Sequence, residues 1–242
     1  MLHTIGYLLI SYACVLANGI FAQDESLSVY TEHFAPYTIA EPDHRLSGSA
    51  VSIVNQALAL AGLETDIKVI PWARAYEIAL SQPNVLLFSM AKTQERAALF
   101  HWLYRITTLK YDFYSLHNKQ VELENITDAL SYTTVAIRGS YEESKLISLG
   151  FTEADNLVLV ANMERAWQML NKGRVHTIFA SHVPVKVISQ IPTQYIRHQA
   201  INDQLSLYVV ASLSTEPVYI NALTRAFEQL EMEYTANSFQ GQ

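Results

Sequence analysis

Residues 88–96 combine an apolar run, a polar break and a single arginine, and they have the clearest chemical character in the chain. Residues 85–88 have the composition of a buried strand, which the polar residues after it interrupt. Thr93 stands where a helix N-cap belongs, so Arg96 would lie in the first turn of a helix. Free N–H groups at a helix start and a guanidinium both favour an anion. The segment therefore predicts a carboxylate-binding site; the alternative is that Arg96 pairs with an acidic neighbour on the surface.

The elements expected before this segment alternate between strand and helix. Apolar patterns indicate these elements in turn at residues 27–31, 49–61, 65–70, 72–80 and 85–88. Such an order is typical of parallel βαβ units, whose ligands bind beyond the carboxyl ends of the strands. Those ends would place Phe34, Tyr37, Trp72 and Arg74 beside residues 89–96 in one crevice. Ordinary core packing is the alternative for the aromatic residues.

A second series of elements follows a long β-rich run at residues 105–117, which could cross from one lobe to another. Strands are expected at 133–138, 157–160 and 175–180, and helices at 141–149, 163–172 and 182–188. Ser140 is a good N-cap for the first of these helices, and Glu142 and Glu143 in its first turn suit the helix dipole. A strand again leads to a helix start.

The last part of the chain is expected to return to the first lobe. Residues 191–203 are polar and irregular, and residues 205–211 have the pattern of a strand. The segment 216–233 is amphipathic and predicts a helix on the outside of the first lobe.

Composition indicates a globular protein with enough material for a large core. The chain has 242 residues, of which 50% are hydrophobic and 16% charged. The formal net charge of −7 argues against nucleic acid or an anionic membrane as a partner, because either would need a basic face.

The first 22 residues have the features of an export signal. Residues 5–17 are almost wholly apolar, and small residues lead to a plausible cleavage site after Ala22. An uncleaved membrane anchor is the alternative. The only cysteine is Cys14, and the residues before it match a lipoprotein signal poorly, so we expect no lipid anchor. A mature chain without cysteine suits an oxidising compartment and excludes thiol catalysis.

Other chemistries find little support. The histidines lack the spacing of metal ligands, so we expect them in the surface or core. A hydrolase site could be assembled from Ser140 and Ser181 with His182 and Asp155 or Asp203. No Gly-x-Ser-x-Gly motif is present, however, and both serines fall at helix starts, where capping explains them. With 8 glycines, the chain also lacks a phosphate-binding glycine loop. We therefore expect no cofactor and no metal.

The order of elements and several short motifs together resemble the bacterial family 3 solute-binding proteins, the periplasmic receptors of amino-acid ABC importers. The resemblance covers roughly residues 28–233, and its most specific motif is Thr93-Gln94-Glu95-Arg96. The weaker motifs are Phe34-Ala35-Pro36-Tyr37, Leu46-Ser47-Gly48, Pro71-Trp72-Ala73-Arg74-Ala75, Ile137-Arg138-Gly139-Ser140 and Gly173-Arg174-Val175.

The resemblance implies a type II periplasmic-binding-protein fold, in which two α/β lobes with mixed, mostly parallel sheets are joined by two crossing strands. Lobe 1 would comprise residues 23–108 and 203–242, and lobe 2 residues 109–202. The lobes of such proteins close over a solute like a hinged clamp.

The resemblance also implies roles for individual residues. Arg96 would hold the carboxylate of the solute, Ser89 and Ala91 would offer backbone groups, and Phe34 would form an aromatic wall. Gly139 and Ser140 of the second lobe would meet the same carboxylate on closure.

One position departs from the family pattern. Family members that bind α-amino acids usually have an aspartate for the ammonium group where this chain has Ser181. A neutral hydroxyl cannot balance a buried ammonium group. We therefore expect an acid or polar solute, recognised with aromatic stacking, rather than a standard α-amino acid.

Two functions remain open from the sequence. The first is a monomeric periplasmic solute-binding protein that serves a membrane permease or a sensor. The second is an enzyme on the same scaffold, similar to cyclohexadienyl dehydratases. The enzyme would need a carboxylate such as Glu32 facing Arg96 across the cleft, with its pKa raised by burial.

Overall fold

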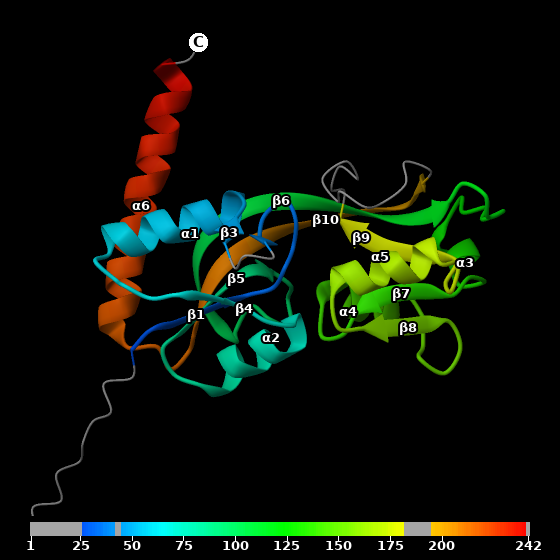
Figure 1. The fold of residues 1–242 in the computed structure, drawn as a ribbon, viewed down its shortest axis with the longest axis horizontal. Helices are drawn as coiled ribbons and strands as arrows, with labels where there is room; N and C mark the ends of the chain where they lie inside the picture. The colour runs from blue at the N-terminus through cyan, green and yellow to red at the C-terminus, as the bar shows by residue number, and fades with distance from the viewer. Residues whose placement is uncertain (1–25, 42–44, 182–194, 241–242) are drawn as a thin grey trace, which may run out of the picture.

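The computed structural model describes residues 26–41, 45–181 and 195–240 (Figure 1). The expected signal peptide at residues 1–22 and the expected helix at 182–188 lie outside these residues.

The fold is a mixed α/β arrangement around one eight-stranded sheet, with a second sheet of two short strands. The strand order of the large sheet is β4-β1-β5-β10-β6-β9-β7-β8. The strands are β1 (Ser28–Thr31), β2 (Ile39–Ala40), β3 (Leu46–Ser47), β4 (Ile67–Val69), β5 (Val85–Ala91), β6 (Phe100–Leu116), β7 (Thr134–Ile137), β8 (Leu157–Val160), β9 (Thr177–Ser181) and β10 (Tyr195–Ser212). The helices are α1 (Ser49–Leu60), α2 (Trp72–Ser81), α3 (Ile126–Ala129), α4 (Tyr141–Ser148), α5 (Met163–Asn171) and α6 (Pro217–Gln240).

The large sheet divides into two groups of elements, which we name lobe 1 and lobe 2. Lobe 1 contains the parallel strands β4, β1 and β5 with α1, α2 and α6. Lobe 2 contains the parallel strands β8, β7 and β9 with α3, α4 and α5. The long strands β6 and β10 pair with each other and join the lobes, because β10 also pairs with β5 and β6 also pairs with β9. The predicted fold class is confirmed.

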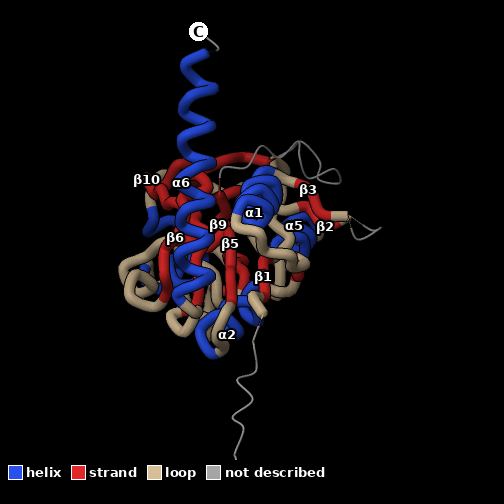
Figure 2. The backbone as a smooth tube through the Cα atoms, turned by 90° about the vertical axis from the view of Figure 1, so that its left-hand side faces the viewer, coloured by secondary structure: helices blue, strands red, loops and turns tan. Residues whose placement is uncertain are grey.

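Strand β5 organises lobe 1 because all of its residues are buried. Leu86 and Phe88 belong to the core beneath α1 and α6, whereas Leu87 and Met90 belong to the core beneath α2. Successive side chains of a strand point to opposite faces, so a continuous apolar run can fill both layers. Helices α1 and α6 contact each other and lie side by side in Figure 2.

The helix predicted after Thr93 is wrong. Residues 94–98 form consecutive turns, and β6 begins at Phe100. Thr93 does make a capping-type contact, since its Oγ1 accepts a hydrogen bond from the Arg96 N–H at 3.3 Å. The connection from β5 to β6 is short and crosses β10, which lies between these two strands.

The irregular stretch predicted at 191–203 is also wrong for residues 195–203, which form the first part of β10. Their polar side chains hid the strand pattern, but β6 pairs antiparallel with residues 195–198 and with Asp203, across an irregularity at 199–202. Arg197 Nε lies 2.7 Å from Asp112 Oδ2 across these two strands, which explains part of the polarity.

Candidate functional site

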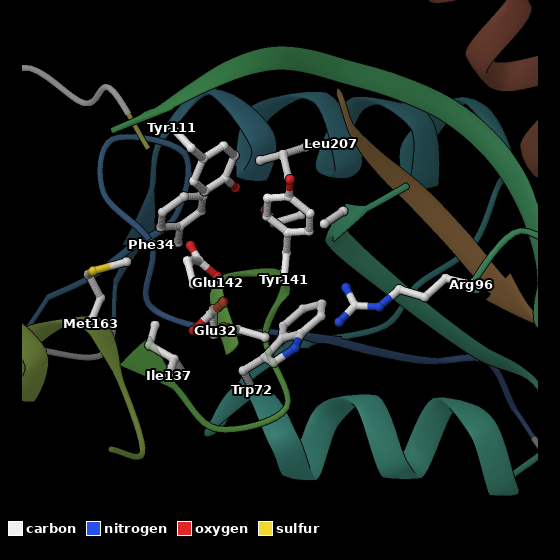
Figure 3. Close-up of a pocket in the computed structure, with 13 residues that line it drawn as sticks. Glu32, Phe34, Trp72, Arg96, Tyr111, Ile137, Tyr141, Glu142, Met163 and Leu207 are labelled. Atoms are coloured by element: carbon white, nitrogen blue, oxygen red, sulfur yellow. The ribbon is translucent and has the colours of Figure 1, made fainter. Parts of the chain in front are cut away.

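A small cavity lies between the two lobes, where the carboxyl ends of β1 and β5 face the start of α4 (Figure 3). It is lined by Glu32, Phe34, Trp72, Ser89, Ala91, Arg96, Tyr111, Ile137, Ser140, Tyr141, Glu142, Met163 and Leu207. Its free space of about 20 Å³ is enough for a single water molecule. The lobes are therefore closed on each other, and a larger solute requires them to separate.

Arg96 is a buried cation at one end of this cavity. Its side chain is only 6% exposed, and its guanidinium carbon lies 5.0 Å from the centre of the Tyr76 ring. Nη1 contacts the Met90 sulfur at 3.8 Å, and Nη2 donates a hydrogen bond to the Gly139 carbonyl at 3.1 Å. Within the described part of the chain, no salt bridge includes Arg96. The guanidinium is thus held in place by an aromatic ring and neutral acceptors, without a carboxylate bonded to it.

The Gly139 carbonyl of lobe 2 receives two hydrogen bonds from lobe 1. Besides Arg96, Trp72 Nε1 donates to it at 2.9 Å. Gly139 has a φ of +72°, and a Cβ added there would lie 3.4 Å from Ala73. Glycine thus provides both the left-handed backbone conformation and the close approach of the lobes.

Ser89 interrupts the ladder between β5 and β10. Its φ is +66°, and the register of β10 skips it, since Tyr208 pairs with Met90 and Val209 with Phe88. A β-bulge of this kind redirects a side chain at a strand end. The Ser89 Oγ is buried and has no hydrogen-bond partner, so the bulge presents an unpaired hydroxyl to the cavity.

Glu32 follows β1 and is 9% exposed. Its Oε2 is buried without a hydrogen-bond partner. Burial raises the pKa of Glu32 to about 8, and the nearby carboxylate of Glu142 adds to the effect. Glu32 therefore carries a proton at neutral pH when the lobes are closed.

Glu142 comes from the opposite lobe, in the first turn of α4. Ser140 caps this helix as predicted, with its Oγ accepting a hydrogen bond from the Glu143 N–H at 3.3 Å. Glu142 is 6% exposed, and burial raises its pKa. Hydrogen bonds from its own backbone and from Ser140, together with the charge of Arg96, oppose that rise.

Aromatic rings form much of the remaining wall. Tyr111 of β6 and Tyr141 of α4 meet edge to face, with ring centroids 5.0 Å apart. Burial raises the pKa of both phenols, and the Tyr141 hydroxyl donates to Asp203 of β10. Phe34 and Trp72 line the cavity from lobe 1. The wall is apolar, with neutral hydroxyl groups.

Most of the residues predicted for the site do lie together. The cavity is lined by seven of them: Arg96, Ser89, Ala91, Phe34, Ser140, Trp72 and Glu32. The carbonyl of Gly139 accepts a hydrogen bond from Arg96 beside the cavity. Arg74 does not line it, because its side chain is exposed two residues beyond Trp72 on α2. Ser181 is buried opposite Tyr111 in the sheet and is not among the lining residues.

Sequence reasoning missed six residues of the wall: Tyr111, Ile137, Tyr141, Glu142, Met163 and Leu207. Glu142 was expected only as a first-turn acid that suits the helix dipole. Helix α4 begins at the interface between the lobes, so Glu142 in its first turn becomes buried when the lobes close.

The described residues contain no group of three or more His, Cys, Asp and Glu side chains placed to hold a metal ion. No helix among them is both long and apolar enough to cross a membrane.

Comparison with known proteins gives structural neighbours only, since no protein-family model and no curated protein sequence matches the chain. A mutant of ArgBP from T. maritima superposes with a TM-score of 0.76 at 11% identity, covering 88% of this chain and 92% of that one. The arginine-, lysine-, histidine-binding protein ArtJ from Geobacillus stearothermophilus superposes with a TM-score of 0.74 at 15% identity, covering 86% of this chain and 90% of that one. A histidine kinase sensor domain with similarity to periplasmic binding proteins superposes with a TM-score of 0.75 at 12% identity, covering 90% of this chain and 95% of that one. These likenesses establish the fold.

Proposed function

We propose that this chain is a periplasmic solute-binding protein that captures a small carboxylate-bearing or polar solute, an amino acid or a related compound, by closure of two lobes. The proposal includes an export signal at residues 1–22, with residues 23–108 and 203–242 as lobe 1 and residues 109–202 as lobe 2. The chain would act as a monomer and present its closed form to a membrane permease or a sensor.

The observation that carries the proposal is Arg96. Arg96 is 6% exposed, forms no ion pair with a carboxylate of the described residues, and borders a cavity between two lobes. Burying such a guanidinium is costly. Its Nη2 bonds a neutral carbonyl from the opposite lobe. A solute carboxylate could replace that carbonyl with a stronger, charge-assisted pair.

Closure follows from contacts on both sides of the cavity. A ligand shifts an equilibrium between open and closed forms only if it binds one form better. A solute that touched Arg96 alone would shift nothing, whereas one that also contacted Ser140 or Tyr141 of lobe 2 would favour the closed form. The neighbours include transporter receptors and a sensor domain, so both readouts fit this fold.

Calorimetry with purified protein and a panel of amino acids and small carboxylic acids tests the proposal. For a bound acid, Arg96→Ala should weaken binding by more than about 1.5 kcal/mol, roughly tenfold. Arg74→Ala is the matched control, because Arg74 is an exposed arginine of the same lobe. Unchanged affinity in Arg96→Ala would remove Arg96 from the site.

A second function, a lyase similar to cyclohexadienyl dehydratases, is favoured by one observation. Glu32 borders the same cavity as Arg96 with a pKa of about 8. A carboxyl group that is protonated at neutral pH can act as a general acid toward a leaving hydroxyl group. Turnover of cyclohexadienyl acids that disappears in Glu32→Gln would support the enzyme. Tight binding without turnover would support the solute-binding protein.

A further inference from the structure

Two carboxyl groups from opposite lobes meet in the cavity. Glu32 follows β1 of lobe 1, Glu142 lies in α4 of lobe 2, and each is at least nine-tenths buried. Both line the cavity, and the charge of Glu142 is close enough to raise the pKa of Glu32. Figure 3 shows them together on one side of Trp72 and Tyr141, with the Arg96 guanidinium on the other.

Glu32 has an unpartnered oxygen in the described structure, whereas Glu142 accepts hydrogen bonds from its own backbone and from Ser140. Glu32 Oε2 has no hydrogen bond, and the Ser89 Oγ in the same wall has none either. None of the salt bridges in the described residues includes Glu32 or Glu142. A buried acceptor without a donor costs free energy that a bound donor would recover.

The charges decide which donor fits. Burial raises the pKa of Glu142 and the charge of Arg96 opposes that rise, while the proton on Glu32 keeps a second negative charge out of the closed cavity. If Glu32 gives up this proton, the cavity gains one negative charge. A protonated nitrogen restores neutrality and supplies several N–H donors, whereas a hydroxyl group restores no charge and a second carboxylate makes the repulsion worse.

We propose that Glu32 and Glu142 form a subsite for a protonated nitrogen, and that the solute carries one net positive charge. Amino acids with a basic side chain and simple monoamines share this chemistry. The inference rests on the proposed function and narrows its solute. It also reverses the expectation from Ser181, because these two glutamates supply the negative charge that Ser181 lacks.

Binding exchanges one cation for another. The Glu32 carboxyl group loses its O–H proton to the buffer, and the ammonium or guanidinium group of the solute takes its place beside the carboxylate. Three other ionisable groups lie around the two glutamates: Arg96 of the β5–β6 connection, Tyr111 of β6 and Tyr141 of α4. The Tyr141 hydroxyl donates a hydrogen bond to Asp203 of β10. Lys145 lies 3.5 Å from Asp203 and balances that acid.

Calorimetry with near-isosteric probes tests the charge requirement in the wild-type protein. The pairs are L-arginine with L-citrulline and L-lysine with L-norleucine, together with the monoamine 1-aminobutane and the acid lactate. We expect a cationic probe to bind about 100-fold more tightly than its neutral counterpart. Binding of L-arginine or L-lysine but not of 1-aminobutane would identify the solute as an amino acid with a basic side chain. Binding of 1-aminobutane alone would identify it as a simple monoamine.

Proton release provides an independent readout. Titrations in two buffers of different ionisation enthalpy should show close to one proton released per bound cation at pH 7. Glu32→Gln should abolish the release, and both Glu32→Gln and Glu142→Gln should weaken binding roughly tenfold or more. The exposed acids Glu77 and Glu164 provide the controls Glu77→Gln and Glu164→Gln, one from each lobe, which should bind as the wild type does.

The outcomes separate the two levels of inference. If a neutral or acidic probe bound as tightly as its cationic counterpart, or if both glutamine variants kept full affinity, the subsite would be refuted while the solute-binding function stood. If neither these probes nor the wider panel of amino acids and small carboxylic acids bound, both would be refuted.

Discussion

The protonation of Glu32 makes closure of the cleft depend on pH. Opening the lobes rehydrates the carboxyl group and returns its pKa from about 8 toward 4.5. Between these pH values the closed, solute-free form binds more protons than the open form. Stabilisation of the closed form is therefore complete below pH 4.5 and is lost as the pH rises through about 8.

The size of this effect follows from the same values. Each pH unit inside the window from 4.5 to about 8 costs the closed form about 1.4 kcal/mol. Summed over the window, the loss is on the order of 5 kcal/mol. Glu142 acts in the same direction because burial also raises its pKa. An effect of this size is enough to move the protein from mostly closed to mostly open.

Small-angle X-ray scattering of the solute-free protein between pH 5 and pH 9 measures the change. The radius of gyration should rise with pH, and Glu32→Gln should flatten the curve because an amide does not ionise. Glu77→Gln, an exposed change in the same lobe, should leave the curve as it is in the wild type. A radius independent of pH, or a pH dependence unchanged in Glu32→Gln, would refute the reasoning.

Three further predictions concern backbone conformation and packing. Gly139→Ala should lower the melting temperature, because it adds about 1 kcal/mol of left-handed strain, and should change solute affinity little, because its Cβ would meet Ala73 across the closed cleft at an ordinary contact distance of 3.4 Å. Gly62→Ala, with similar φ but open space around it, should lower the melting temperature and leave calorimetric affinity intact. Asn162→Ala removes an N-cap and should cost about 1 kcal/mol in urea unfolding, without changing affinity. Phe227→Ala should cost about 3–5 kcal/mol in the same assay, because the ring is buried in the core beneath α6.

The sequence was most informative where one local pattern decides the structure. Ser140 was predicted as an N-cap from its residue type, and it caps α4. The run at 85–88 is apolar throughout because β5 is buried on both faces, and this pattern predicted a buried strand. These features depend on neighbours in the sequence, so the sequence contains the evidence for them.

The sequence was least informative where the partner comes from far along the chain. Residues 195–198 and Asp203 belong to a strand because β6 pairs with them, although the pattern of this stretch is polar. Thr93 makes its capping contact without a helix after it, since the chain must continue into β6. Glu142 is buried only because the lobes close over the start of α4. Long-range pairing and closure leave no local mark in the sequence.

Protonation of Glu32 also affects how well a permease or sensor can use closure to detect bound solute. A solute must favour the closed form by roughly 5.5 kcal/mol to take it from rare to dominant. In the solute-free closed form, a proton on Glu32 takes the place of the protonated nitrogen of the solute. The Gly139 carbonyl at Arg96 takes the place of the solute carboxylate. Acidity therefore stabilises an empty closed form by nearly the free energy that a solute must supply. A permease or sensor that recognised closure alone would respond to low pH as it does to solute, so discrimination should be sharpest near or above pH 8, where the proton is lost and the cation remains.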